Sequence, residues 1–160
     1  MPGMSDPTDA LRIFQDALLT GPVELERGRV DPDVYCHPHR GQRTPQFTYV
    51  RLEGKTVLAF ATFALNGTYN GCPNLAVGYA VPEALRGKGR AKDILRAGIA
   101  ELENGFRGMP PFYVEAVVSE KNVASLKVAE AVLGGEAERI NDSHSAEPAV
   151  RYARKFETKA

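Results

Sequence analysis

The ten-residue run Thr56–Leu65, TVLAFATFAL, is apolar at both odd and even positions. A strand with one face in water alternates apolar and polar residues, so this run predicts a strand covered on both faces. Such strands occur in layered folds, where helices pack on a sheet. No apolar run in the chain approaches the roughly 18 residues expected of a membrane-spanning helix, so no membrane partner is expected.

Strand and helix patterns alternate along most of the chain. Residues 21–45 are rich in Gly, Pro and Arg, lack clear periodicity, and are interpreted as a loop region with at most a short helix or strand. Asn66-Gly67 predicts the turn that ends the strand Thr56–Leu65. The other predicted strands are 46–53, 75–81, 112–118, 136–140 and 149–156. This order predicts an α/β (α+β) fold, a mixed central β-sheet flanked by helices.

Three amphipathic patterns predict the helices. Residues 90–104 and 122–133 form the second and third helices, and the first precedes Gly21-Pro22. The residues expected to face inward are Leu11, Phe14, Leu18 and Leu19 in the first, Ala91, Ile94, Leu95, Gly98, Ile99 and Leu102 in the second, and Val123, Leu126, Ala129 and Leu133 in the third.

Length and charge narrow the class of protein. The 160 residues predict a single domain, 1–160, with residues 1–8 as a flexible N-terminus. The 20 Lys and Arg balance the 20 Asp and Glu, which argues against general nucleic-acid binding. The start of the chain has no signal-peptide pattern, and only Cys36 and Cys72 are present. A reducing, cytoplasmic location is therefore expected.

The segment Val77–Ala91, VGYAVPEALRGKGRA, carries the clearest indication of chemistry. A buried strand runs into a turn that contains Gly87 and Gly89, and an amphipathic helix starts at once. Glycines let the backbone approach a ligand closely, and the free amides and dipole of a helix N-terminus favour an anion. The cationic side chains in this turn belong to Arg86, Lys88 and Arg90. The pattern predicts a phosphate or pyrophosphate site; the alternative is a solvated basic turn.

Two familiar nucleotide motifs do not fit this turn. A Walker A loop needs Ser or Thr after its Lys, but Gly89 follows Lys88. A dinucleotide fingerprint needs a third Gly where Lys92 stands. A phosphate-loop nucleotide-binding module is therefore disfavoured.

The remaining pattern, Arg/Gln-x-x-Gly-x-Gly/Ala, is filled by Arg86, Gly89 and Ala91 and follows Ala80-Val81-Pro82. Here the sequence resembles the GNAT superfamily of N-acetyltransferases, in which this turn binds the pyrophosphate of coenzyme A. A second GNAT-like motif, Asn-x-x-Ala/Ser on the helix after the next strand, fits Asn122–Ser125, with Leu133-Gly134-Gly135 at the helix end. The resemblance spans roughly residues 47–156.

The resemblance implies a GNAT fold in which two parallel strands splay apart to form the acetyl-CoA cleft. The pantetheine arm would lie between Tyr79–Val81 and Val117–Ser119, with backbone amides near Ala80 and Val81 polarising the thioester carbonyl. Acetyl-CoA is the expected cosubstrate. The coenzyme-binding residues that the resemblance implies are Ala80, Val81, Arg86, Gly87, Lys88, Gly89, Arg90, Ala91, Asn122 and Ser125.

The resemblance further implies acetyl transfer to a primary amine, which must lose a proton before it attacks. Glu115 is the first candidate for the base, and Ser119 or a water is expected to protonate the thiolate. Many relatives carry a Tyr acid seven residues after the Asn, where this chain has Ala129. The acceptor, whether small molecule, peptide or protein, stays open. The alternative is a catalytically silent GNAT-like domain that binds coenzyme A or a protein partner.

The cluster Cys36-His37-Pro38-His39 is the other group of chemically active side chains. A structural zinc site needs four ligands, and only the distant Cys72 and His144 remain. No metal is therefore expected; the cluster either lines an acceptor pocket or consists of polar loop residues. A homodimer is compatible with the sequence.

Overall fold

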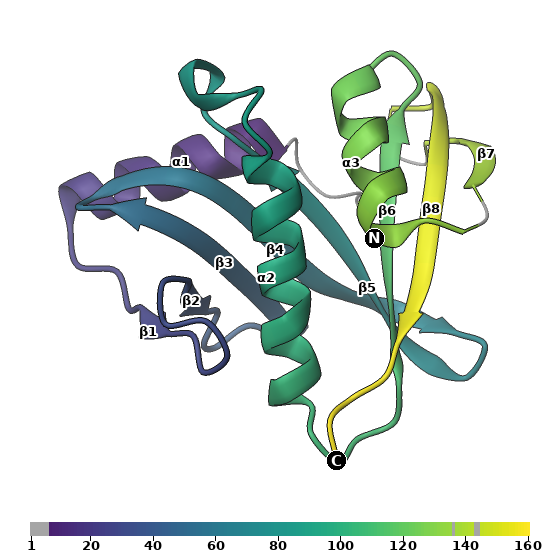
Figure 1. Ribbon diagram of the computed structural model, residues 1–160, viewed down its shortest axis with the longest axis horizontal. Coiled ribbons are helices and arrows are strands. Elements are labelled where there is room, and N and C mark those ends of the chain that lie inside the picture. The colour runs from purple at the N-terminus through teal and green to yellow at the C-terminus, as the bar shows by residue number, and fades with distance from the viewer. Residues whose placement is uncertain (1–6, 136, 143–144) are drawn as a thin grey trace.

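A computed structural model describes residues 7–135, 137–142 and 145–160. This part of the chain forms one eight-stranded mixed sheet with the strand order β1-β2-β3-β4-β5-β6-β8-β7 (Figure 1). The elements in chain order are α1 (Pro7–Thr20), β1 (Glu26–Arg27), β2 (Tyr35–Pro38), β3 (Gln46–Glu53), β4 (Thr56–Tyr69), β5 (Cys72–Ala80), a 3₁₀ turn (Glu83–Leu85), α2 (Arg90–Gly105), β6 (Phe112–Ser119), α3 (Val123–Leu133), β7 (Ala137–Asn141) and β8 (Pro148–Phe156).

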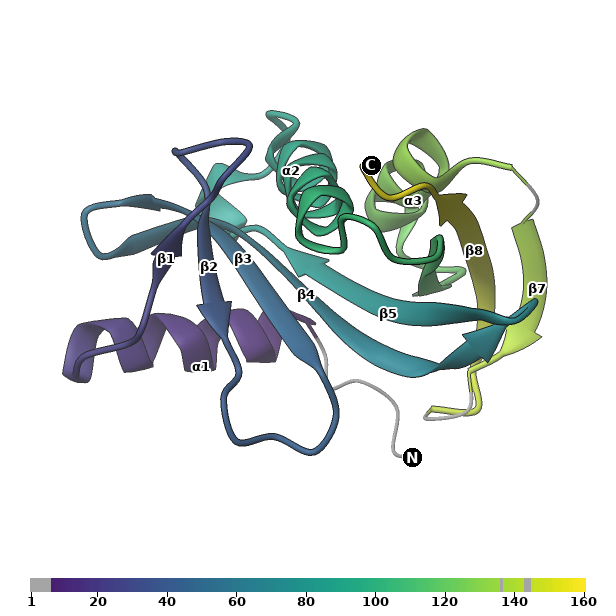
Figure 2. The same ribbon diagram turned by 90° about the horizontal axis from the view of Figure 1, so that it is seen from below.

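The helices lie on both faces of the sheet. Helices α2 and α3 cover one face and α1 covers the other, as Figure 2 shows from below. Phe63 of β4 belongs to the larger core cluster beneath α2 and α3, while Phe60 of the same strand packs with the α1 residues Leu11 and Phe14. The strand covered on both faces is thus confirmed, because successive side chains of a strand point to opposite faces.

Strands β5 and β6 form the parallel pair of this sheet, and they pair only briefly. Their register joins Asn74 to Tyr113, Leu75 to Val114 and Ala76 to Glu115, while both strands continue further. Figure 1 shows them meeting near one end and separating toward the N-termini of α2 and α3. The predicted mixed, splayed sheet is confirmed.

The predicted turn at Asn66-Gly67 is wrong. Strand β4 continues to Tyr69, and its hairpin to β5 turns at Asn70 and Gly71, which both have positive φ, 49° and 78°. Two consecutive residues with positive φ are typical of the tight turn that matches strand twist. The register between β4 and β5 shifts between Leu65 and Thr68, so the first Asn-Gly pair lies in an irregularity within the strand.

Other predictions need smaller corrections. The loop region 21–45 contains β1 and β2, and β2 pairs with β3 through residues that alternate too weakly to be recognised as a strand. Helix α1 begins at Pro7, inside the segment 1–8 expected to be flexible. Leu19 and Val123, expected to face inward, are 60% and 58% exposed. Leu19 lies off the buried stripe that ends at Leu18, and Val123 is the first residue of α3. None of the described helices combines the length and apolarity needed to cross a membrane.

A candidate coenzyme and amine site

The gap between β5 and β6 leaves backbone groups without strand partners. Beyond Ala76 and Glu115 the two strands no longer pair with each other, although β5 still pairs with β4 up to Ala80 and β6 pairs with β8 up to Ser119. The two strand edges that face each other are therefore open over residues 77–80 and 116–119. An extended ligand can add to such edges in the manner of a further strand.

The glycine turn lies at the end of β5, where the gap is widest. Gly87 and Gly89 have φ of 82° and 75°, and a Cβ at either residue would meet no atom within 4 Å. Gly89 is the N-cap of α2 and provides no side-chain acceptor, so the first amides of α2 have no cap from it. This is the open, positively polarised helix end that an anion requires.

The predicted coenzyme-binding residues differ in their hydrogen bonds and in their exposure. Arg86 Nε donates to the carbonyl oxygen of Val81 at 3.0 Å, which ties the turn to the end of β5. Lys88 is exposed, whereas Ala80 and Val81 are buried. Asn122 Oδ1 accepts a hydrogen bond from the Ser125 N–H at 3.1 Å, so Asn122 caps α3. The turn residues and the α3 cap lie at the same end of the gap (Figure 1).

Tyr79 is a site residue whose side chain our sequence reasoning did not single out. Its hydroxyl donates to the Ser125 carbonyl oxygen at 2.8 Å and accepts from Ser125 Oγ at 3.0 Å. Burial raises the pKa of Tyr79, so the hydroxyl keeps its proton near neutral pH. The pair connects β5 to the first turn of α3 across the diverging strands. No periodicity in the sequence links residues 46 positions apart.

Glu115 lies where β5 and β6 separate, on the sheet face opposite α2 and α3. It is 7% exposed, and its carboxylate accepts hydrogen bonds from Arg151 Nε at 2.6 Å, from Asn66 Nδ2 at 3.1 Å and from Asn74 Nδ2. Burial opposes the charge of Arg151, but hydrogen bonding and charge attraction from Glu115, with smaller contributions from Tyr69 and Glu138, together raise the pKa of Arg151. Glu115 and Arg151 therefore form a buried ion pair at the point where the two strands separate.

Polar and aromatic groups surround this carboxylate. The Arg151 guanidinium lies 5.0 Å from the Tyr69 ring centre, and the Tyr69 and Tyr113 rings meet edge to face at 4.8 Å. Asn74 is 4% exposed, and its Oδ1 finds no hydrogen-bond donor among the described residues. A buried acceptor without a donor is uncommon in folded proteins. The point where β5 and β6 separate thus holds one paired carboxylate and one unmatched acceptor, both of them buried.

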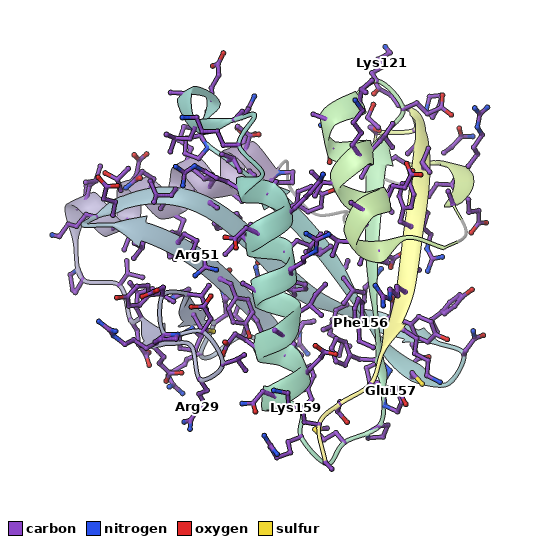
Figure 3. The ribbon with its side chains drawn as sticks, viewed as in Figure 1. Arg29, Arg51, Lys121, Phe156, Glu157 and Lys159 are labelled. Atoms are coloured by element: carbon purple, nitrogen blue, oxygen red, sulfur yellow. The ribbon has the colours of Figure 1, made fainter. Side chains whose placement is uncertain are left out.

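Ser119 lies on the same face of β6 as Glu115 but four residues further along. At about 3.3 Å per residue, their Cα atoms are about 13 Å apart. Ser119 Oγ accepts from the Lys121 N–H at 3.3 Å, at the turn that Figure 3 marks with Lys121. One thioester therefore cannot contact both side chains directly, and at least one of them would have to act through water.

The Cys36–His39 cluster divides between the two faces of the sheet. Cys36 packs against the core beneath α2, and burial raises the pKa of its thiol to about 11. The His37 ring packs against Phe14 of α1, and His39 Nε2 lies 2.7 Å from Thr48 Oγ1. Among the described residues no three His, Cys, Asp or Glu side chains converge as metal ligands, and His144 lies outside these residues.

Known proteins share this architecture but little sequence. No family model matches the chain, and no curated protein matches it in sequence. Solved structures do match: RimL, the ribosomal L7/L12 alpha-N-protein acetyltransferase with coenzyme A (18% identity, TM-score 0.53, 71% of this chain and 64% of that one), and Mycobacterium smegmatis RimJ with CoA-disulfide (19%, 0.55, 69% and 53%).

A third match is Arabidopsis thaliana Naa50 with the bisubstrate analogue CoA-Ac-MVNAL (14% identity, TM-score 0.53, 68% of this chain and 72% of that one). The chain spans 64% of the RimL chain and 53% of the RimJ chain, so those proteins contain further parts that it does not match. At these identities the likeness concerns the fold. The chain has the fold of the GNAT N-acetyltransferases, as its two sequence motifs predicted.

Proposed function

We propose that this protein is an acetyl-CoA-dependent N-acetyltransferase that acetylates a primary amine. The observation that carries the proposal is the open β5–β6 strand pair with the Gly87–Gly89 turn and the start of α2 at its wide end. The GNAT fold of the chain supports it. We propose that pantetheine lies along the open edges and that the α2 amides bind the pyrophosphate.

We propose Glu115 as the base, acting directly or through one water. The incoming amine is mostly protonated near neutral pH and gives up a proton to the carboxylate. We propose that the Oδ1 of Asn74, which has no donor among the described residues, accepts an N–H of the same amine and so orients its lone pair. Arg151 and Asn66 hold the carboxylate in place, so its position is set before the substrate binds.

The remaining steps follow from thioester chemistry. The neutral amine nitrogen bonds to the carbonyl carbon, and the backbone amides of Ala80 and Val81 stabilise the oxyanion. The carbon–sulfur bond then breaks, and the second proton of the nitrogen passes through Ser119 or water to the thiolate. An amide and free coenzyme A result. A thiol of ordinary acidity, with a pKa of roughly 8.5, leaves without a strong acid.

The direct test is thiol release from acetyl-CoA in the presence of amines. The panel holds peptide N-termini, a peptide with an internal lysine and small amines. Peptide N-termini come first because the names of RimL and the Naa50 ligand point to N-terminal amines. Amine-dependent thiol release supports the proposal. Coenzyme binding without release for any amine class would instead favour the silent coenzyme-binding domain.

A pair of variants tests the base. Glu115→Gln keeps the shape of the side chain and removes the charge, and we expect its kcat to fall about 10²–10⁴-fold. Glu120→Gln is the matched control, because Glu120 lies in the loop after β6 and pairs only distantly, at 3.7 Å, with Arg139. Equal activity of both variants would exclude Glu115 as the base.

A further inference from the structure

A second pocket lies on the far side of α2 from the coenzyme gap. It has a volume of about 360 Å³ and lies between the first turn of α2, the β3–β4 hairpin and the segment before β2. No residue of β5 or β6 lines it. Its volume is at the lower end of the range of small-molecule sites, about 300–1,000 Å³, so it suits a ligand no larger than a single amino acid or sugar.

Arg51 fixes the walls of this pocket. Its Nη2 lies 2.7 Å from Asp31 Oδ2, and its Nε and Nη2 donate to Asp93 of α2 at 2.9 and 3.1 Å. Figure 3 shows Arg51 beside α2. Hydrogen bonding to Arg51 lowers the pKa of Asp31, so the Asp31 carboxylate stays charged and paired with Arg51. One guanidinium and two carboxylates leave this wall with a net negative charge, and their pairing holds the segment before β2 against α2.

Two further charges in the pocket have no partner. The Nε of Arg90 is buried and has no acceptor, and no described carboxylate lies within 4.0 Å of its guanidinium. Asp33 also lines the pocket and forms no ion pair with a described residue. A buried donor without an acceptor is destabilising, so this arrangement favours a ligand that provides an acceptor.

The floor between these charges is apolar. Leu52, Leu58 and Ala59 line the same pocket, and Ala59 is 1% exposed. A simple anion would match Arg90 but would face Asp33 and Asp93. A simple cation would match Asp33 but would face Arg90 and Arg51. A molecule with one negative charge, one positive charge and an apolar group complements Arg90, Asp33 and the apolar floor.

We infer that this pocket binds a free α-amino acid with an apolar side chain. Its carboxylate accepts from Arg90, its ammonium lies against Asp33, and its side chain packs on Leu58 and Ala59. The ligand is separate from the amine acceptor, since the pocket shares no strand with the coenzyme gap. The pocket does share the first turn of α2 with the proposed pyrophosphate site, so we assign Arg90 to the second ligand rather than to the coenzyme. The inference does not rest on acetyl transfer, and its test uses no coenzyme.

The test is calorimetric titration of the whole protein with L-leucine and two fragments of it. The first fragment, 4-methylpentanoate, lacks the ammonium, and the second, 3-methylbutylamine, lacks the carboxylate. The other free amino acids complete the panel. We expect saturable binding of apolar amino acids, at least about tenfold tighter than of either fragment, because each charge contributes about 1.5–3 kcal/mol.

Variants assign the two charges. Asp33→Asn should weaken the binding at least about tenfold. Asp16→Asn, on the exposed side of α1, is the matched control and should bind as the wild type does. Arg90→Gln tests the contact with the carboxylate of the ligand. If Arg90→Gln does not fold, Asp33→Asn still tests the inference. Absence of saturable binding by every free amino acid would overturn the inference. Equal binding of leucine and either fragment, or an unchanged affinity in Asp33→Asn, would do the same.

Discussion

The Tyr79 hydroxyl of β5 donates to the Ser125 carbonyl oxygen at 2.8 Å and accepts from Ser125 Oγ at 3.0 Å. Ser125 belongs to the first turn of α3, whose N-cap Asn122 accepts from the Ser125 N–H. One tyrosine thus connects the end of the coenzyme strand to the capped start of a helix over the neighbouring strand.

Removing this hydroxyl tests how strongly the connection holds. Tyr79→Phe should lower the free energy of unfolding by about 1 kcal/mol, because it deletes two part-buried hydrogen bonds and leaves the Ser125 groups unmatched. Urea unfolding measures the change. Tyr113→Phe is the control: its hydroxyl accepts only from exposed Asn70, at 3.3 Å, and its effect should stay within about 0.5 kcal/mol. Equal effects would contradict the account.

Glu101 of α2 holds the chain between β1 and β2. Its buried carboxylate accepts from the backbone N–H of Arg29 at 2.7 Å, of Val30 at 3.0 Å and of Asp31 at 2.8 Å. Glu101→Gln puts an N–H₂ group against backbone donors, so we expect a loss of about 2–4 kcal/mol in stability. Thermal and urea unfolding measure it. The Glu103 side chain forms no hydrogen bond with a described residue, so Glu103→Gln should change stability little. A loss in Glu103→Gln as large as that in Glu101→Gln would show that the backbone hydrogen bonds to Glu101 are not the cause.

Stability should depend on pH through His39. Burial and the neighbouring His37 lower the pKa of His39 below its ordinary value of 6.5. Below pH 6.5 the unfolded chain therefore binds this proton more readily than the folded chain does, so stability falls as the pH falls through this window. Above pH 6.5 His39 is mostly neutral in both the folded and the unfolded chain, so the full stability is retained there. In His39→Gln, unfolding free energies measured from neutral to mildly acid pH should decline less steeply. An unchanged slope would contradict the assignment.

The Ala129 position cannot take a tyrosine without strain. Ala129 is 0% exposed and belongs to the core cluster that contains Tyr152. Ala129→Tyr should lower stability by about 1–3 kcal/mol, because it overfills a packed core. Ala124→Tyr, at an exposed position of the same helix, is the control and should change stability little. If Ala129→Tyr unfolds at the same urea concentration as the wild type, the core around Ala129 accommodates a tyrosine and the expectation is contradicted.

Much of the central sheet could be predicted because burial leaves a periodic pattern. Phe60 and Phe63 belong to opposite faces of β4, and the apolar run around them admits only a covered strand. Ile94, Leu95, Ile99 and Leu102 repeat at helical spacing and form the buried face of α2. The glycine turn could be predicted because positive φ at Gly87 and Gly89 demands that residue type.

Other features depend on contacts that no local pattern contains. Asn66-Gly67 and Asn70-Gly71 carry the same turn chemistry, and pairing along the full length of β5 decides between them. Tyr79 meets Ser125, and Glu115 meets Arg151, only because strands far apart in sequence become neighbours. Strand β2 is short and lies near an edge, where half-buried residues replace the apolar alternation.

The central claim is that the open strand pair and the Gly87–Gly89 turn bind acetyl-CoA, and a melting experiment with three proteins tests it. At about 100 times its Kd, acetyl-CoA should stabilise the wild type by about 2.7 kcal/mol and raise its melting temperature. Gly89→Glu should lose this gain, because a side chain and a negative charge enter the space for phosphate. Gly54 in the β3–β4 turn also has a positive φ and open surroundings, so Gly54→Glu is the control and should keep the stabilisation by acetyl-CoA. If saturating acetyl-CoA leaves the wild-type melting temperature unchanged, or if Gly89→Glu responds as Gly54→Glu does, the claim is contradicted.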